Sequence, residues 1–427
     1  MNRFRTARVE WARLDNASKI FPATSNNKDT KVFRLTCELF ETVKPEILQQ
    51  ALNETVENFP LHRSILRRGV FWYYLETSDI QPIVEIESNP VCSPIYKGDK
   101  RNLLFRIFYY NNRINLELFH ALSDGIGALW FMQSLVYHYI IRRYKDNFVN
   151  TIPTFDCNSS ISKKIDDSFE KHFIGNNKRK QKSKDRKKEN TSAYHIKGTR
   201  LEENRIKLIE GSMSVKAVLD QAHGYNTTLT IFLTSLFIYS IYKVMPVHMK
   251  NHPVVLSVPI NLRYFFESVT ARNFFSTMNV GYDFGKSNDD FKEVIHGVNQ
   301  CFQNDLTEER LNYQLKHLMA LEQNPFIRAI PLPLKDCSLR IATKLTDRKI
   351  TSTISNIGQV SMPLGFDSYI RQFSICISAR RPQITMCSYE DRLVVSFTSP
   401  FRETEIQRTF FQLLSKMGIE IEISSNI

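Results

Sequence analysis

Residues Leu116–Leu129 read LELFHALSDGIGAL, and this stretch decides how the chain around it is organised. Apolar and polar residues alternate up to His120, so in a strand every second side chain, that of His120 included, faces the same side. After Gly125 the apolar residues recur at helical spacing instead. We therefore predict a strand, a connection that carries His120 and Asp124, and then a helix. Connections of this kind hold functional residues more often than packing residues.

The side chains in this connection suit proton transfer. A neutral imidazole takes a proton from an alcohol or an amine near pH 7 and gives it to a leaving group, which is the role expected of His120. Asp124 fits a structural role, in which an ion pair holds the shape of the connection, and Gly125 leaves room for a substrate. On residue types alone, the alternative is a strand-end histidine whose ring is satisfied by hydrogen bonds.

Length and composition predict a globular chain of more than one lobe. The 427 residues are too many for one ordinary core and fit two lobes of about 200 residues each. No N-terminal segment joins a basic start to an apolar run and a cleavage site, so we expect a cytoplasmic protein. Leu229–Met245 is the most apolar run, but it contains hydroxyl residues and Lys243, and we predict a buried helix rather than a membrane span.

The seven cysteines are scattered and include no CxxC pair. Neither a disulfide framework nor a zinc site is predicted, and we expect reduced thiols and no metal. The net charge of +13 is concentrated in Lys178–Lys188, which holds eight Lys or Arg residues and one Asp. This run has no aromatic residue for base stacking, so we predict a solvated loop rather than a nucleic-acid site. Docking of an acidic partner or an anionic surface stays an open alternative.

Periodicity and turn residues predict the remaining elements in two groups separated by a polar segment. The first group comprises a strand at 33–39, a helix at 45–56, and strands near 69–76, 82–87, 103–110 and 113–119. The second comprises helices at 214–222 and 228–244, strands at 253–259 and 277–284, a largely helical stretch at 289–322, strands at 350–356, 371–378, 384–389 and 392–398, a helix at 403–416 and a strand at 418–424. We thus predict an N-terminal lobe over 1–150, a Lys-rich crossover linker over 151–204 and a C-terminal lobe over 205–427.

The spacing His120-Ala-Leu-Ser-Asp124-Gly125 is the HxxxDG signature. It resembles the acyltransferase superfamily of chloramphenicol acetyltransferase, plant acyltransferases, alcohol acetyltransferases and condensation domains. Val9–Pro22 is similar to the opening of bacterial proteins grouped with alcohol acetyltransferases, and several later segments match the superfamily in order. The resemblance covers almost the whole chain. It implies an α/β (α+β) fold like that of chloramphenicol acetyltransferase, with two lobes, a mixed sheet flanked by helices in each, and an active-site tunnel between them.

The same resemblance implies further site residues. Val258–Arg263 is similar to the segment whose strand-end arginine pairs with the motif aspartate in relatives, so Arg263 is the expected structural partner of Asp124. The segment Arg272-Asn273-Phe-Phe resembles the Gly-Asn-Phe segment at the substrate channel of relatives, with arginine in place of the glycine. The resemblance implies a substrate-binding role for Asn273. The stretch 352–358 is similar to the hydroxyl-rich strand that borders the pantetheine tunnel in relatives. It implies substrate-binding roles for Thr353, Ser355 and Asn356. The hydroxyls of Thr353 and Ser355 are candidates for stabilising an oxyanion.

The implied function is transfer of an acetyl or other acyl group from a coenzyme A thioester to an alcohol or amine, with His120 as general base. Acyl-coenzyme A would be a co-substrate, and no bound cofactor is expected. A condensation-type enzyme supplied by a carrier protein in trans is the nearest alternative, although Phe119 stands where condensation domains have a second histidine. A non-catalytic binding module of the same fold and a protein that binds nucleic acid or an anionic surface are more distant alternatives.

Overall fold

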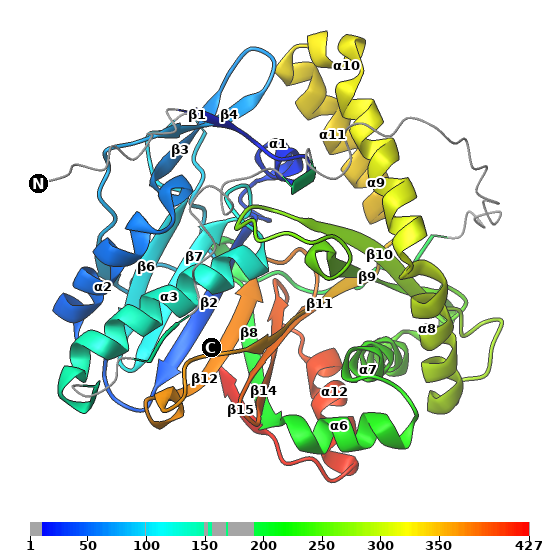
Figure 1. Cartoon of the computed structure of the whole chain (residues 1–427). Helices are drawn as coiled ribbons and strands as arrows, with labels where there is room; N and C mark the ends of the chain where they lie inside the picture. Colours follow the sequence, from blue (N-terminus) through cyan, green and yellow to red (C-terminus); the bar gives the residue numbers. More distant parts are fainter. Residues whose placement is uncertain (1–10, 99, 149–152, 156–167, 170–191, 427) are drawn as a thin grey trace, which may run out of the picture.

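The computed structural model describes residues 11–98, 100–148, 153–155, 168–169 and 192–426. The basic run Lys178–Lys188 and most of the predicted linker lie outside these residues. The described chain forms two lobes, each with a β-sheet and helices packed on it, and Figure 1 shows them side by side. The fold is the two-lobed α/β architecture that the sequence predicts.

The first lobe is built on a five-stranded sheet in which only the pair β5 and β6 is parallel. Helices α2 (Pro45–Glu57) and α3 (Gly125–Arg143) pack against each other over one face of it (Figure 1). Helix α2 starts with proline at a position that needs no amide hydrogen, and its buried side chains recur at helical spacing. The strands, in spatial order, are β12 (Ile370–Ile377), β2 (Val32–Leu39), β7 (Arg113–Phe119), β6 (Phe105–Tyr110) and β5 (Val84–Ile86).

The second lobe is built on a seven-stranded mixed sheet, in which β11 is parallel to both of its neighbours. In spatial order the strands are β10 (Phe275–Tyr282), β9 (Val254–Asn261), β11 (Ser352–Val360), β13 (Gln383–Tyr389), β14 (Arg392–Ser399), β8 (Lys207–Ser214) and β15 (Glu422–Ser425). The helices of this lobe are α6 (Val215–Gly224), α7 (Leu229–Val244), α8 (Phe291–Asp305) and α12 (Glu405–Lys416), as Figure 1 shows.

Strand β12 lies in the C-terminal half of the sequence but belongs to the sheet of the first lobe. It pairs antiparallel with β2 from Ile370 to Ile377. Two side chains of β13 in the second sheet also bond to the backbone of β12: Thr385 Oγ1 donates to the carbonyl oxygen of Ile375 at 2.5 Å, and Cys387 Sγ lies 3.3 Å from that of Phe373. The predicted C-terminal lobe, 205–427, therefore contributes one strand to the first sheet.

Elements from the N-terminal and C-terminal halves of the sequence also meet outside the two main sheets. The short helix α1 (Ile20–Thr24) packs against α11 (Leu332–Asp347), and Tyr73 Oη donates to Asp336 Oδ2 at 2.9 Å. The other elements of this region are β1 (Trp11–Arg13), β3 (Ser64–Arg68), β4 (Tyr73–Thr77), α9 (Glu308–Gln323) and α10 (Pro325–Ala329). The described 3-10 helices are Ala17–Lys19, Pro60–Arg63, Lys145–Phe148, Glu202–Asn204, Val247–Met249, Leu262–Tyr264 and Phe366–Ser368.

The predicted strand at 69–76 is wrong over its first half. The chain turns there, because the amide of Gly69 donates to the carbonyl oxygen of Trp72 at 3.0 Å, and β3 and β4 form a hairpin around the turn. The aromatic residues in the turn, Phe71 and Trp72, gave the segment the composition of a strand. Six further elements were not predicted: β1, α1, β3, β8, α10 and α11.

The apolar run Leu229–Val244 forms helix α7, which packs against α8, α12 and β9. Its first turn is capped by the side chain of Thr228, which accepts from the amide of Ile231, as predicted. Among the described helices, no single one is long and apolar enough to cross a membrane. Helices α6 and α7 reach that length and composition only as a pair, and the pair is bent by 80°.

One buried histidine in the first lobe lies away from the connection after β7. The ring of His62 stacks on Phe131 with 4.5 Å between centroids and packs edge-on against Phe59 and Phe105. Burial lowers the pKa of His62 to about 3, and neither ring nitrogen has a hydrogen-bond partner among the described residues. His62 is therefore a neutral, unsatisfied polar group in an aromatic cluster, which costs stability.

We expect His62→Phe to raise the free energy of unfolding, and to raise it most in acid. Unfolded His62 binds a proton near pH 6.5 but folded His62 binds one only near pH 3. The wild type therefore loses stability as the pH falls between these values, by up to about 1.4 kcal/mol per pH unit, and the variant lacks this loss. Urea unfolding of both proteins at pH 8, 7, 5.5 and 4.5 measures the difference. A difference that stays constant with pH would show that folded His62 takes up its proton at the same pH as unfolded His62.

Candidate functional site

His120 lies at the end of β7 and lines a cavity of about 920 Å³ between the lobes. Side chains of both sheets form the walls, with Phe33 and Ile375 from the first sheet and Val258 and Ile384 from the second. Seven of the eight site residues that the sequence predicts line this one cavity: His120, Asp124, Gly125, Arg263, Thr353, Ser355 and Asn356. The eighth, Asn273, is buried beside the His120 ring instead of lining the wall.

The predicted order of strand, connection and helix is confirmed around His120. Strand β7 ends at Phe119, and the amide of His120 donates to the carbonyl oxygen of Lys31 at 2.8 Å. Asp124 caps helix α3, because its Oδ1 accepts from the amide of Gly127 at 2.9 Å. The connection is therefore held at both of its ends.

Asp124 and Arg263 form a two-pronged ion pair across the lobes. Arg263 Nη1 donates to Asp124 Oδ2 at 2.8 Å and Nη2 to Oδ1 at 3.2 Å, and the two side chains are only 6% and 5% exposed. The amide of Phe274 also donates to Asp124 Oδ2, at 2.9 Å. With so many bonds the carboxylate is occupied as an acceptor, which fits the structural role predicted for Asp124.

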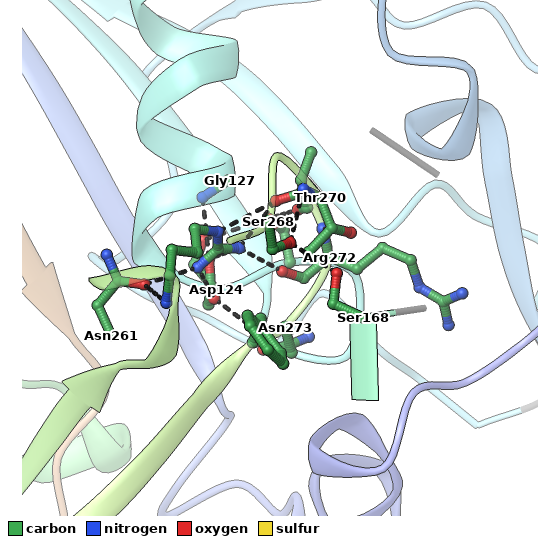
Figure 2. A network of polar contacts seen from close by, with 12 residues as sticks. Asp124, Gly127, Ser168, Asn261, Ser268, Thr270, Arg272 and Asn273 are labelled. Atoms are coloured by element: carbon green, nitrogen blue, oxygen red, sulfur yellow. Dashed lines mark hydrogen bonds and ion pairs between the residues drawn. The ribbon is translucent and has the colours of Figure 1, made fainter. Parts of the chain in front are cut away.

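The guanidinium of Arg263 also binds the segment between β9 and β10. Figure 2 shows Asn261, Thr270 and Arg272 of this polar network close to Asp124. The guanidinium donates to the carbonyl oxygens of Thr270 at 2.9 Å and Arg272 at 2.7 Å, and to Asn261 Oδ1 at 3.2 Å. Its carbon lies 5.4 Å from the ring centre of Trp130 in α3. Arg263 therefore joins the helix after His120 to a loop of the second lobe through bonds in several directions.

Glycine is required where α3 approaches that loop. A Cβ atom at Gly127 would overlap the carbonyl oxygen of Ala271 and the hydroxyl of Ser123. Sequence reasoning did not single out Gly127, although its position two residues after Gly125 is visible in the sequence. Gly125 itself borders the cavity, where a Cβ atom would lie 3.1 Å from Ile357. Its hydrogen keeps the cavity wall open next to His120.

Aromatic rings fix the plane of the His120 imidazole. Phe21 of α1 stacks on it with 4.2 Å between centroids and 15° between planes, and Phe33 meets it edge-on at 5.1 Å. Phe275 lies 5.6 Å away. Phe21 belongs to the segment Val9–Pro22, for which the sequence alone offered no chemical role. The structure places the end of this segment directly on the histidine ring.

Asn273 determines which ring nitrogen of His120 carries the proton. Its Nδ2 donates to the carbonyl oxygen of His120 at 3.0 Å, and a carbonyl oxygen can only accept. The amide oxygen of Asn273 therefore faces His120 Nδ1, at 3.1 Å. This network assigns the hydrogen to Nδ1 and leaves the lone pair on Nε2. The neutral ring thus has one nitrogen, Nε2, able to accept a proton.

The surroundings of His120 also keep the ring neutral near pH 7. Burial lowers its pKa below the ordinary value of 6.5, and the positive charge of Lys31 adds to that effect. Hydrogen bonds to a backbone carbonyl and to Asn273, and the charge of Asp124, act in the opposite direction and are outweighed. A histidine with a lowered pKa is ready to act as a base without first losing a proton.

Strand β11 forms the wall that carries the remaining predicted residues. Thr353 and Ser355 are half-buried on the cavity side, and Asn356 Nδ2 donates to Thr230 Oγ1 at 3.0 Å. The amide oxygen of Asn356 accepts from Gly358, whose φ of +86° suits a residue without a Cβ atom. The pairing of β11 with β13 shifts register at this point. Asn356 thus shapes the wall, and Thr353 and Ser355 line the cavity beside it.

Basic residues that sequence reasoning missed also line the cavity. Arg381 Nη2 pairs with Asp347 Oδ2 at 2.6 Å, whereas the side chain of Arg380 is 46% exposed and lies 3.4 Å from the same carboxylate group. Both lie shortly after the end of β12 at Ile377. No sequence pattern marks them, because arginines after a strand are common on protein surfaces.

Comparison with known proteins identifies the fold. No family model and no curated protein matches the chain. The solved structure of polyketide synthase associated protein 5 from Mycobacterium tuberculosis matches with a TM-score of 0.62 and 14% identity, over 94% of this chain and 96% of that one. The trichothecene 15-O-acetyltransferase TRI3 from Fusarium sporotrichioides matches with a TM-score of 0.61 and 9% identity, over 95% and 94% of the two chains.

A third match is the starter condensation domain of a rhizomide synthetase RzmA mutant in complex with C8-CoA. Its TM-score is 0.62 at 13% identity, over 96% of this chain and 95% of that one. The likeness to all three structures extends over nearly the whole chain. The fold implied by the HxxxDG resemblance, two lobes with mixed sheets, is therefore confirmed.

Proposed function

We propose that this protein transfers an acyl group from a coenzyme A thioester to an alcohol or an amine, with His120 as the general base. The observation that carries the proposal is the Asn273 contact, which leaves His120 Nε2 as the basic nitrogen of a neutral ring on the cavity between the lobes. The likeness to an acetyltransferase and to a condensation domain in complex with C8-CoA supports the same chemistry.

The reaction needs one proton carrier. Nε2 of His120 takes the proton of the acceptor hydroxyl or amine while the acceptor atom attacks the thioester carbonyl carbon. The tetrahedral intermediate then collapses, the carbon–sulfur bond breaks, and Nε2 gives its proton to the leaving thiolate. The hydroxyls of Thr353 or Ser355 donate hydrogen bonds to the developing oxyanion. Asp124 and Arg263 keep their charges throughout and hold the connection in place.

The cavity suits a ligand with an apolar part and an anionic part. Its volume of about 920 Å³ lies at the upper end of the range for small-molecule sites. Phenylalanine and isoleucine side chains on its walls fit an acyl chain, and the exposed guanidinium of Arg380 offers a cation to phosphate groups. Coenzyme A carries such phosphates at one end and the thioester at the other.

A condensation-type reaction, with the acyl group on a carrier protein, is the second candidate. The likeness to a starter condensation domain and to a polyketide synthase associated protein favours it. A carrier would present the same thioester to His120 through its pantetheine arm, so the catalytic step would be unchanged. The two candidate reactions differ in the donor molecule, which is coenzyme A in one and a carrier protein outside the cavity in the other.

We expect release of thiol from acetyl-coenzyme A to require an acceptor alcohol or amine. Direct transfer involves no acyl-enzyme, so the kinetics should be sequential and no burst of thiol should appear without acceptor. A thiol reagent measures the release across a panel of alcohols and amines, with longer acyl-coenzyme A donors and an acylated carrier protein in parallel.

The control for this experiment is His120→Gln, which should show no acceptor-dependent release. A stoichiometric burst without acceptor, with an acylated serine or cysteine peptide detected by mass spectrometry, would contradict direct transfer. Release from the carrier thioester alone would select the condensation reaction over the coenzyme A reaction.

A further inference from the structure

Two buried residues near the N-terminus continue the hydrogen-bond chain that begins at the His120 ring. Asn273 Nδ2, besides bonding to the His120 carbonyl oxygen, donates to Ser18 Oγ at 2.8 Å. The hydroxyl of Ser18 donates in turn to Asp15 Oδ1 at 2.6 Å, and the amide of Ser18 donates to the same oxygen at 2.7 Å. The chain thus runs from a carboxylate through a hydroxyl and an amide to the imidazole.

Each donor in this chain has a fixed direction. The Ser18 hydroxyl has a single hydrogen, and Asp15 takes it, so Ser18 Oγ is left as an acceptor toward Asn273. Asp15, Ser18 and Asn273 are 1%, 0% and 1% exposed, which excludes bulk water as a substitute partner. Arg272 Nε lies 3.7 Å from Asp15 Oδ2 and balances the buried negative charge.

We propose that Asp15 and Ser18 are positioning residues that fix the tautomer of His120 by preventing Asn273 from flipping its amide. A flipped amide would turn the oxygen of Asn273 toward two acceptors, the His120 carbonyl oxygen and Ser18 Oγ, which is unfavourable. It would also turn Nδ2 toward His120 Nδ1, and the ring would then carry its hydrogen on Nε2. That tautomer cannot accept a proton from a substrate.

The carboxylate of Asp15 sets the direction of these hydrogen bonds, because it can only accept. If asparagine replaces Asp15, its amide can donate to Ser18 Oγ, and the Ser18 hydroxyl is free to rotate and donate to the flipped oxygen of Asn273. Of the two unfavourable contacts of the flipped Asn273 oxygen, only the one with the His120 carbonyl oxygen would then remain. The importance of the tautomer for catalysis rests on the proposed function, whereas the tautomer itself is a property of the resting protein.

The test measures the tautomer and the kinetics separately. Long-range ¹H–¹⁵N correlation spectra of the full-length protein with ¹⁵N-labelled histidine report which nitrogen of each ring is protonated, and His120→Gln identifies the His120 signals. In the wild type we expect the hydrogen on Nδ1. In Asp15→Asn and Ser18→Ala we expect a second population with the hydrogen on Nε2, a decrease of roughly tenfold in kcat, and a KM that changes little.

Ser235→Ala is the matched control. Ser235 is as buried as Ser18, and its hydroxyl donates to the carbonyl oxygen of Ile231 within helix α7, with no bond to His120. The control should leave both the tautomer and kcat unchanged.

A wild-type His120 that carries its hydrogen on Nε2 would overturn the proposal without any variant, even if the variants failed to fold. Folded Asp15→Asn and Ser18→Ala proteins with the wild-type tautomer and kcat would overturn it as well. If the variants shift the tautomer but no preparation transfers acyl groups, the positioning role holds and the proposed function fails.

Discussion

Replacing His120 with alanine is expected to lower kcat for acyl transfer by roughly 10²–10⁴-fold, the usual contribution of a general base. Asp124 cannot replace Nε2 of His120 as the base in the proposed reaction, because its carboxylate is occupied by Arg263 and by two amides. The fold should survive, since the ring borders an existing cavity and its removal enlarges that space instead of creating a closed void.

Steady-state rates with the donor and acceptor that the wild type uses best provide the measurement, and thermal unfolding checks the fold. His223→Ala, at an exposed histidine of α6, is the control and should retain full activity. Added imidazole should restore part of the rate of His120→Ala if the missing group is a base. A variant with activity within twofold of the wild type would exclude His120 as the base.

The second large effect is expected at the ion pair of Asp124 and Arg263. Breaking a buried pair by removing one partner typically costs about 3–5 kcal/mol, because the other charge stays buried without compensation. We expect Arg263→Ala and Asp124→Asn each to lower both the free energy of unfolding and kcat. The double variant should be no worse than the more damaging single variant, since both changes remove the same interaction.

Urea unfolding and steady-state kinetics are measured for the wild type, the two single variants and the double variant, which together form a double-mutant cycle. Arg205→Ala is the matched control, because Arg205 pairs with Glu203 at 2.7 Å on the surface, where the side chains are 58% and 71% exposed. Its unfolding midpoint should remain that of the wild type. Losses that simply add in the double variant would show that Asp124 and Arg263 act independently of each other.

The sequence predicts the local part of this site well. The change from alternating to helical periodicity on either side of His120 is a local signal, and the structure has β7 and α3 where the signal places them. The partner of Asp124 was expected from a resemblance and not from spacing, because 139 residues separate it from Arg263. Periodicity carries no information on contacts over such a distance.

The contacts that hold the His120 ring could not be predicted for the same reason. Asn273 was expected at a substrate channel, yet it lies against the ring, 153 residues away in sequence. Ser18 and Phe21 come from a segment that resembled other proteins without indicating a chemical role. Their contacts with Asn273 and the His120 ring depend on how the segment from Ala17 to Thr24 packs in the folded protein, which short segments of sequence do not encode.

Strand β12, which the C-terminal half of the sequence contributes to the sheet of the first lobe, constrains how ligands reach His120. In many two-lobed enzymes the lobes swing apart about a hinge to admit a substrate. Here such a swing would have to break the antiparallel ladder between β12 and β2, or the bonds from Thr385 and Cys387 that tie β13 to β12. We therefore expect ligands to reach His120 through local side-chain and loop motions, which are faster than a swing of whole lobes.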